Sequence, residues 1–305
     1  MRRRGPLSLP IFLLFTIGAV YPLIFTMNKI AVDAGTPPLA FTFWQTLGAA
    51  VLLLIVAAWR RALPRLEARH LKAYFVLGLF GIAAPVALMT WLAPKLPTGI
   101  LSMVVILSPP ITYLIALTLR LERVRALSLI GVLCGVGGIL LMAIPTFSLP
   151  DPSMVVWFLL ALLAPASFAL TNNLAALIDP PETPVLTFAS GIVTAAAIML
   201  APVMIGLGET YVVPGPDTAA DLAILGAAGV TITMYITFLI IVRAAGPVFF
   251  SQFNYVVVVA GLGWGILFFQ ESHSAYVWAA AALMLAGVAL LIHAARRQPE
   301  TPAEP

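Results

Sequence analysis

Polar side chains inside long apolar runs are the residues of this sequence whose types could do chemistry. In water-free surroundings each of them needs a hydrogen-bond partner or a wet cavity. Amide, hydroxyl and indole groups recognise a solute by hydrogen bonding and stacking, and they do not by themselves make or break its bonds. The candidates for contact with a small molecule are Lys29, Trp44, Gln45, Thr90, Trp91, Tyr235, Gln252, Asn254 and Tyr255.

Three of these side chains, Gln252, Asn254 and Tyr255, gather on one short part of a valine-rich run. This local density of polar groups makes them our first choice for substrate contact. Serine and threonine hydroxyls can instead return a hydrogen bond to a backbone carbonyl of their own helix. For Ser167 and Thr231 we therefore expect a structural role.

Lys29 and the two tryptophans each have two interpretations, which the sequence leaves open. An ammonium group at a helix centre costs roughly 3 kcal/mol on insertion scales, but Lys29 lies near the end of its run. It can extend to the membrane surface, or it can point inward and pair with a substrate carboxylate or with Asp33. Trp44 and Trp91 can line an outer vestibule, where they would stack on an apolar or cationic ligand, or they can join an aromatic belt at the interface.

The residue inventory argues against an enzyme, a metal site and a resident cofactor. The chain has 1 cysteine, Cys134, and 3 histidines, without a His-x-x-x-His motif. Asp217 and Asp221 have the spacing of a diphosphate-magnesium motif, but no partner motif accompanies them, so we assign them to a loop and a helix start. A repeated pore-lining signature, which a channel would need, is also missing from the sequence.

Composition places the chain in the membrane. It has 305 residues, of which 62% are hydrophobic and only 9% are charged, and its mean hydropathy is +1.07. A soluble domain carries about 25% charged residues. Backbone groups in lipid must be paired within their own segment or in a closed barrel, and uninterrupted apolar runs favour helices. We therefore expect an all-α integral membrane protein. Its partner is the lipid bilayer, and we expect no binding of nucleic acid.

About ten runs have the length, roughly 20 residues, that is needed to cross the hydrocarbon. The first run follows three arginines but lacks a small-x-small cleavage site, so we interpret it as a retained helix rather than a signal peptide. Connections between the runs are short. The predicted spans are 9–32, 38–59, 73–94, 98–119, 126–145, 154–177, 184–206, 220–243, 247–269 and 274–294.

The lysine and arginine bias of short loops predicts the orientation. If the amino terminus is cytoplasmic, 14 of the 16 basic residues fall on that side, and only Lys29 and Lys95 do not. Both termini are then cytoplasmic, and we expect the polar tail 298–305 to be disordered.

The chain resembles two copies of one half. Glu122 and Gly138 recur 149 residues later as Glu271 and Gly287, which predicts one five-helix repeat at 1–149 and a second at 150–297. Because five is an odd number, the second repeat must enter the membrane upside down. Inverted repeats of this kind are a transporter architecture, in which a site near the midplane opens to either face in turn.

Prolines inside the runs and the two elbow glutamates are candidates for structural and gating roles. Proline removes a backbone donor and tends to kink a helix, and the freed carbonyls can face a polar cavity. The alternative is that these prolines only accommodate packing. The gating candidates are Pro22, Pro85, Pro109, Pro110, Glu122 and Glu271.

This order of residues resembles the EamA branch of the drug/metabolite transporter superfamily. The half-repeat of that family has a lysine late in its first helix, a proline in the fourth, a glutamate just after it and a glycine-rich fifth. The matching positions are Lys29, Pro109 or Pro110, Glu122, Gly131, Gly135, Gly138, Glu271 and Gly287. Two positions depart from the pattern: Gln45 replaces a usual arginine, and the region of Val258 lacks a usual proline, which predicts a ninth helix straighter than the fourth.

The resemblance implies a carrier of small organic metabolites, most often an exporter of amino acids or related compounds in the bacterial inner membrane. Carriers of nucleotide-sugars, phosphorylated compounds or cationic drugs are the alternatives within the transporter class. A membrane enzyme or a channel is the alternative outside it. The motifs Gly131-x-x-x-Gly135 and Gly261-x-x-x-Gly265 permit close helix contact, within a monomer or across a homodimer.

Overall fold

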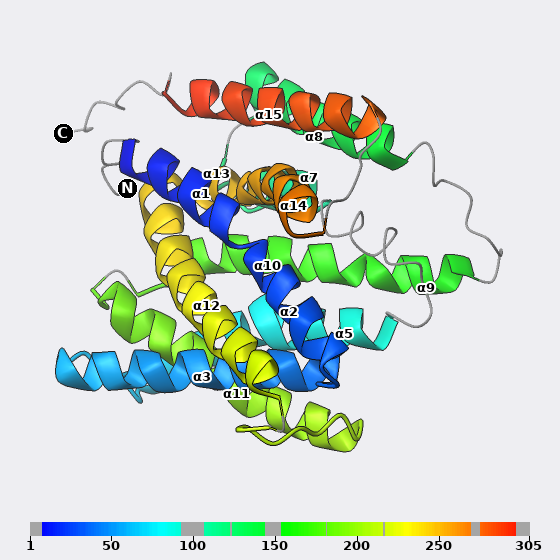
Figure 1. Ribbon diagram of the computed structural model, residues 1–305. Helices are drawn as coiled ribbons and strands as arrows, with labels where there is room; N and C mark the ends of the chain where they lie inside the picture. Colours follow the sequence, from blue (N-terminus) through cyan, green and yellow to red (C-terminus); the bar gives the residue numbers. More distant parts are fainter. Residues whose placement is uncertain are drawn as a thin grey trace.

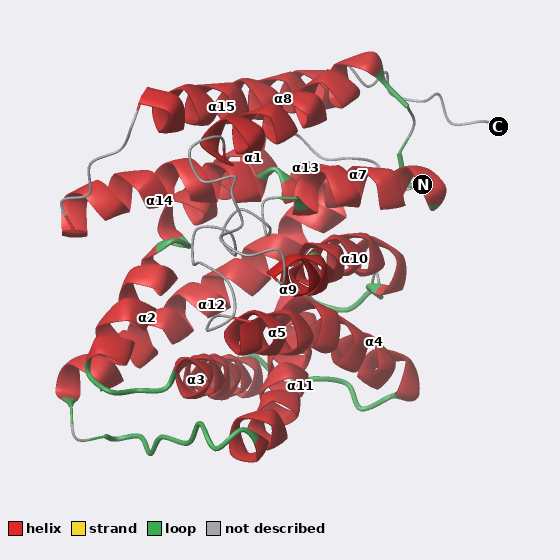
Figure 2. Cartoon of the chain, turned by 90° about the vertical axis from the view of Figure 1, so that its right-hand side faces the viewer, coloured by secondary structure: helices red, strands yellow, loops and turns green. Residues whose placement is uncertain are grey.

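A computed structural model describes residues 8–92, 107–122, 124–143, 154–180, 182–215, 217–269 and 275–296. Within these residues all regular secondary structure is helical, as Figures 1 and 2 show. This confirms the predicted all-α class.

The described helices follow one another with short connections. Those before residue 150 are α1 (Ser8–Val20), α2 (Leu23–Asp33), α3 (Pro38–Trp59), α4 (Ala68–Gly78), the π-helix η1 (Leu79–Ala83), α5 (Ala84–Leu92), α7 (Ser108–Thr118) and α8 (Ala126–Ala143). Those after it are α9 (Met154–Ala161), α10 (Leu163–Ile178), α11 (Val185–Gly206), α12 (Thr218–Ala245), α13 (Pro247–Ser251), α14 (Phe253–Phe269) and α15 (Ala275–Arg296).

The helices lie where the apolar runs predict spans, and several runs are interrupted. By length and composition, 5 helical stretches can cross a membrane, and they are 38–59, 68–89, 159–178, 185–206 and 218–245. Shorter apolar helices occupy parts of four further predicted runs, at 8–20, 126–138, 247–261 and 278–287. The multi-pass membrane class therefore stands, and the number of ten stays a prediction.

α3 and α11 are built alike although few of their residues are identical. Each follows an extended proline, Pro37 (φ −60°, ψ 141°) or Pro184 (φ −56°, ψ 143°), and each has 22 residues. A shift of 147 residues places ten of the eleven buried residues of α3 on buried residues of α11. Phe41 and Phe188, for example, correspond to each other and are both fully buried.

The ends of α3 and α11 show that the two helices are antiparallel. The Leu39 N–H at the start of α3 donates to Glu209 Oε2 (3.0 Å), just beyond the end of α11. Thr187 Oγ1 near the start of α11 donates to the carbonyl of Ala62 (2.7 Å), just beyond the end of α3. Ala62 and Glu209 are also 147 residues apart. The start of each helix therefore donates a hydrogen bond to corresponding residues just beyond the end of the other helix.

α8 and α15 form a second reciprocal, antiparallel pair along one side of the molecule (Figures 1 and 2). A β-carbon at Gly138 would lie 2.9 Å from the Ala280 carbonyl oxygen, and one at Gly287 would lie 2.6 Å from that of Gly131. The spacing of 149 residues relates Gly131 to Ala280 and Gly138 to Gly287. Gly131 and Gly135, which are predicted to permit close helix contact, therefore lie against Gly287 within one chain. For the motif of Gly261 and Gly265, close helix contact stays a prediction.

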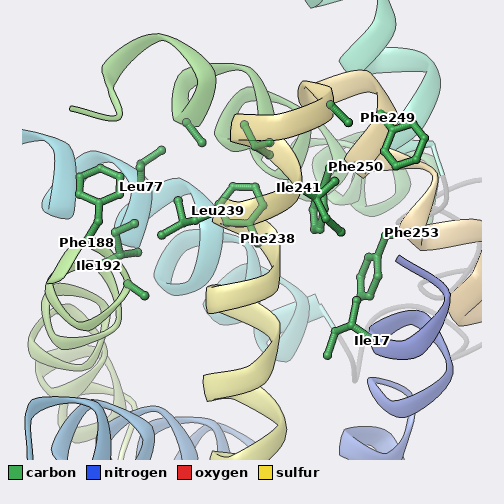
Figure 3. Close-up of a cluster of buried hydrophobic side chains, with 14 of the residues drawn as sticks. Ile17, Leu77, Phe188, Ile192, Phe238, Leu239, Ile241, Phe249, Phe250 and Phe253 are labelled. Atoms are coloured by element: carbon green, nitrogen blue, oxygen red, sulfur yellow. The ribbon is translucent and has the colours of Figure 1, made fainter. Parts of the chain in front are cut away.

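The largest buried apolar cluster joins helices from both halves. Figure 3 shows Leu77, Phe188, Phe238, Phe250 and Phe253 in this cluster, to which α1, α4, α10, α11, α12, α13 and α14 contribute. The Phe250 and Phe253 rings stack with their centroids 5.4 Å apart. In lipid such contacts gain little from the hydrophobic effect, so close packing supplies the stability.

The prediction that the ninth run is straighter than the fourth stays a prediction, because residues 98–106 of the fourth run lie outside the described part of the chain. The ninth run, 247–269, is not one continuous helix. It is divided at Gln252 into α13 and α14, and the α14 part does run unbroken past Val258. The reason for the break is local, because Ser251 Oγ and Gln252 Nε2 both donate to the Val248 carbonyl (2.8 and 3.1 Å). These side chains compete with the backbone for its acceptor, and the Gln252 N–H bonds instead to the carbonyl of Phe249.

Candidate functional site

The candidate site lies where interrupted helices meet near the middle of their runs. The α1–α2 run turns at Tyr21 and Pro22, the α4–α5 run contains η1, and the α9–α10 run turns at Leu162. Each interruption falls within a few residues of the centre of its run, which is the membrane midplane if the run crosses. Broken helices at that depth commonly build the binding sites of transporters.

The π-helix follows from the proline that succeeds it. Pro85 has no N–H to donate to the carbonyl of Gly81 in α-helical bonding, or to that of Phe80 in π-helical bonding. Both carbonyls accept a hydroxyl from another helix instead. Ser167 Oγ on α10 donates to Phe80 (2.9 Å), and Tyr235 Oη on α12 donates to Gly81 (3.2 Å).

Gly81 makes this junction compact. A β-carbon at Gly81 would lie 3.0 Å from Thr171 Cγ2 and 3.2 Å from Tyr235 Oη. Any larger residue would press on both α10 and α12. α10 and α12 therefore converge on one turn of η1, and their hydroxyls bind the carbonyls that Pro85 leaves without a backbone donor.

The turn between α1 and α2 is stabilised in the same way. Pro22 again removes a donor, and the Trp264 indole N–H on α14 donates to the Ala19 carbonyl (2.7 Å). The Tyr21 ring meets the Phe253 ring edge-on, with centroids 5.2 Å apart. Carbonyls beside the interruptions in the first half thus accept hydrogen bonds from side chains of the second half.

A buried ion pair ties together one end of the helices that form the site. Arg243 in the last turn of α12 makes a bidentate contact with Asp179, which directly follows α10. The exposed fractions of the two side chains are 16% for Arg243 and 4% for Asp179. A two-pronged guanidinium–carboxylate contact is among the stronger polar interactions in proteins.

The connection between α10 and α11 is also held on its other side. His70 on α4 is buried, and its Nε2 lies 2.9 Å from Thr183 Oγ1. His70 Nδ1 lies 3.3 Å from a carboxylate oxygen of Glu67, although the two do not meet in hydrogen-bond geometry. Asp179 is therefore held by the end of α12, and Thr183 by the start of α4.

Of the predicted contact residues whose side chains the structure describes, Tyr235 is the one that reaches this junction. Trp44 instead donates its indole N–H to the Tyr211 carbonyl (2.7 Å), in the connection that follows α11. Gln45 is buried on α3, with its Oε1 lacking a partner among the described atoms. Both remain predictions as substrate contacts.

The cluster of Gln252, Asn254 and Tyr255, our first choice for substrate contact, lies apart from the junction of η1, α10 and α12. Its side chains make packing contacts at α13 and α14. Gln252 is fully buried, and Asn254 donates to the Ser251 carbonyl (3.2 Å). Tyr255 is also fully buried, and a β-carbon at Gly135 would lie 2.0 Å from its hydroxyl oxygen. In this conformation Tyr255 fills the space that Gly135 leaves on α8.

Several predicted residues lie outside the described part of the chain. These are the side chains of Lys29, Thr90 and Trp91, and the whole of Glu271. Glu122 lies in the turn after α7, where its N–H bonds to the Ala116 carbonyl (3.2 Å). Pro109 and Pro110 fall in the first turn of α7 as described, where a missing N–H is tolerated.

Sequence reasoning did not find Asp179, Arg243 or Trp264. It expected a structural role for Ser167, with a bond inside its own helix rather than to Phe80. The available signal for the ion pair was one carboxylate and one guanidinium at helix ends predicted on the same membrane side. Among the residues that the structure describes, no group of three His, Cys, Asp or Glu side chains is placed to hold a metal ion. The groups at the junction of η1, α10 and α12 that could contact a ligand are hydroxyls, aromatic rings and the backbone carbonyls of the π-helix.

Replacing Pro85 by alanine should restore a regular helix and impair transport. The new N–H would compete with the Ser167 and Tyr235 hydroxyls for the carbonyls of the π-helix, and releasing one such bond is worth about 1 kcal/mol. We expect thermal stability to stay the same or rise, while transport by purified protein in liposomes falls severalfold. A matched Pro202→Ala variant, within the continuous helix α11, should keep its transport rate. Equal loss of transport in both would contradict a specific role for the π-helix.

Comparison with known proteins adds a family and a fold. Residues 8–144 match the EamA-like transporter family. Among solved structures 28 chains match, and one of these, described only as a crystal structure of protein, superposes with a TM-score of 0.75 over 97% of this chain and 99% of its own, at 19% identity. At that identity the likeness concerns the fold alone. A search of curated proteins found no significant match.

Proposed function

Residues 8–144 match the EamA-like transporter family, and from this premise we propose that the protein is a secondary transporter of small organic metabolites. The substrates that we favour are amino acids or related compounds, moved in the export direction across a bacterial inner membrane. Both chain termini would then face the cytoplasm.

The observation that carries the proposal is the reciprocal pairing of the two halves. α3 with α11 and α8 with α15 are antiparallel pairs whose corresponding residues are 147 and 149 residues apart. Corresponding helices that run in opposite directions are what an inverted repeat requires. We infer two five-helix repeats, at 1–149 and 150–297, related by an axis in the membrane plane.

Alternating access follows from this symmetry. The two halves can exchange conformations about the junction of η1, α10 and α12, so that a central site opens to one face and then to the other. The contacts Asp179–Arg243 and His70–Thr183 hold the helices together at one end of the bundle. In the alternate conformation these contacts must separate so that the site opens at that end.

The chemistry of the junction favours substrates without a large net charge. The buried polar groups that the structure describes on α10 and α12 are hydroxyls and amides, and the nearby guanidinium of Arg243 is already paired with Asp179. A phosphorylated substrate would need a cation there. We therefore propose facilitated movement or exchange of neutral or zwitterionic compounds.

Counterflow in liposomes tests the proposal. Purified protein is reconstituted with an unlabelled amino-acid mixture inside, and the uptake of the same labelled mixture outside is followed. A carrier gives saturable uptake above equilibrium. Since Tyr235→Phe removes the hydroxyl that reaches Gly81, we expect this variant to transport about five- to tenfold more slowly, in line with the loss of one hydrogen bond of about 1 kcal/mol.

Three results would count against this proposal. Flux that rises linearly with concentration would indicate a channel, and a covalently changed product would indicate an enzyme. Unchanged counterflow in Tyr235→Phe would remove the junction from the transport path. A control variant, Thr233→Val, alters a hydroxyl that donates to the carbonyl of Gly229 within its own helix, and should transport normally.

A further inference from the structure

The segment from Trp59 to Lys72 differs sharply from its counterpart in the other half. It joins two stretches that can span a membrane, 38–59 and 68–89, so it lies at a membrane edge. Residues 60–72 contain five lysines and arginines and one glutamate. The corresponding residues 207–219 contain no lysine or arginine and two acidic residues.

Hydrogen bonds hold the backbone of this segment at Ala62 and Arg65. Arg61 adopts a left-handed conformation (φ 54°), as Gly208 does at the corresponding position (φ 71°). The Ala62 N–H bonds to the Ala57 carbonyl (2.7 Å), and the Arg65 N–H donates to Tyr74 Oη (3.3 Å). Together with the Thr187 bond to Ala62, these contacts fix the direction in which the exposed side chains leave the loop.

The outward side combines cationic and apolar groups. All five basic side chains are exposed, and so are Trp59 (79%), Leu63 (54%) and Leu66 (78%). The Arg60 guanidinium lies 5.3 Å from the centre of the Trp59 ring, which keeps an aromatic face and a positive charge together. Aromatic and aliphatic side chains with adjacent cations are suited to the boundary between acyl chains and headgroups.

We propose that Trp59–Lys72 is a docking segment for anionic phospholipid, in which the arginines bind headgroup phosphates while Trp59, Leu63 and Leu66 enter the interface. The positive charge selects anionic over zwitterionic lipid. The exposed apolar residues select a lipid over free phosphate, because a soluble anion gains nothing from them. The proposal does not depend on what the protein transports.

Lipid titration of the intact purified protein, followed by native mass spectrometry and thermal unfolding, tests the proposal. The probe is phosphatidylglycerol, with phosphatidylcholine and inorganic phosphate as separate arms. We expect phosphatidylglycerol to bind and to raise the unfolding temperature, phosphatidylcholine to do so less, and inorganic phosphate to have no effect. Stabilisation by inorganic phosphate equal to that by phosphatidylglycerol would overturn a lipid site.

Two double variants, each of which removes two positive charges from a different segment, decide the question. Arg60→Gln/Arg65→Gln should weaken phosphatidylglycerol binding roughly thirtyfold, since each cation near an anionic surface contributes about a factor of five. Arg120→Gln/Arg125→Gln removes the same charge at the turn after α7 and should retain binding. Equal weakening in both variants would overturn the proposal, because it would show only a general effect of net charge. Both arginines of the first variant are exposed, so folding in detergent should not limit the test.

Discussion

Gly287→Val is expected to lower the free energy of unfolding by about 3 kcal/mol, the upper end of the usual cost of overpacking. Its β-carbon would lie 2.6 Å from the Gly131 carbonyl oxygen, 3.3 Å from Cys134 Cβ and 3.4 Å from the Gly135 backbone nitrogen. Two of these three atoms belong to the backbone of α8, so no side-chain rotation relieves the clash. α8 and α15 must separate, and the close contact along one side of the molecule is lost. Thermal unfolding in detergent measures the effect.

The matched control for Gly287→Val is the same substitution at Gly229, in the middle of α12. A β-carbon at Gly229 meets nothing within 4 Å. The control therefore isolates the change in helix propensity, which is below about 1 kcal/mol. If both variants lost the same stability, close packing of α8 on α15 would not be the cause. Gly138→Val, whose β-carbon would lie 2.9 Å from the Ala280 carbonyl oxygen, should resemble Gly287→Val because the contact is reciprocal.

Arg243→Met is expected to lower the free energy of unfolding by about 3–5 kcal/mol, the usual cost of breaking a buried ion pair from one side. The Asp179 carboxylate, with 4% of its side chain exposed, would be left without its counter-charge. The double variant Asp179→Leu/Arg243→Met should recover most of the loss, because apolar residues can replace a buried pair at little cost. Thermal unfolding of the single and double variants measures the loss of stability and its recovery.

The double variant also separates stability from gating. If the pair closes one end of the transporter in each cycle, the recovered protein should transport at a rate that differs severalfold from the original. A normal rate would mean that the pair only stabilises this end of α10 and α12. Asp33→Asn is the control for removing a carboxylate at the end of α2, and because that side chain is exposed we expect a change within about 0.5 kcal/mol.

Individual prolines show why the sequence located the helical runs better than their interruptions. Pro22 accompanies a turn between α1 and α2, whereas α11 continues through Pro202. Both prolines remove a backbone donor. The outcome depends on what reaches the freed carbonyls, and Trp264, which donates beside the turn at Pro22, is 245 residues away from its acceptor Ala19. A local pattern contains no information about such a partner.

The candidate site shows the same limit for polar residues. Tyr235 and Tyr255 are both tyrosines within apolar runs, and the sequence favoured the crowded group at Gln252, Asn254 and Tyr255. In the structure Tyr235 reaches the unwound backbone at Gly81, whereas Tyr255 packs against Gly135. The difference arises from which helix lies opposite, and periodicity within one helix does not specify its neighbour.

The sequence by itself determined that this is a helical membrane protein, where its apolar runs lie, and that its halves share the spacing of Glu122 and Gly138 with Glu271 and Gly287. These properties depend on composition and length along one stretch of chain, because lipid requires each run to satisfy its own backbone. Only the tertiary structure decided which hydroxyls bind the carbonyls of η1 and that Asp179 pairs with Arg243. Those contacts join residues at least 64 positions apart, so they exist only once the helices have packed.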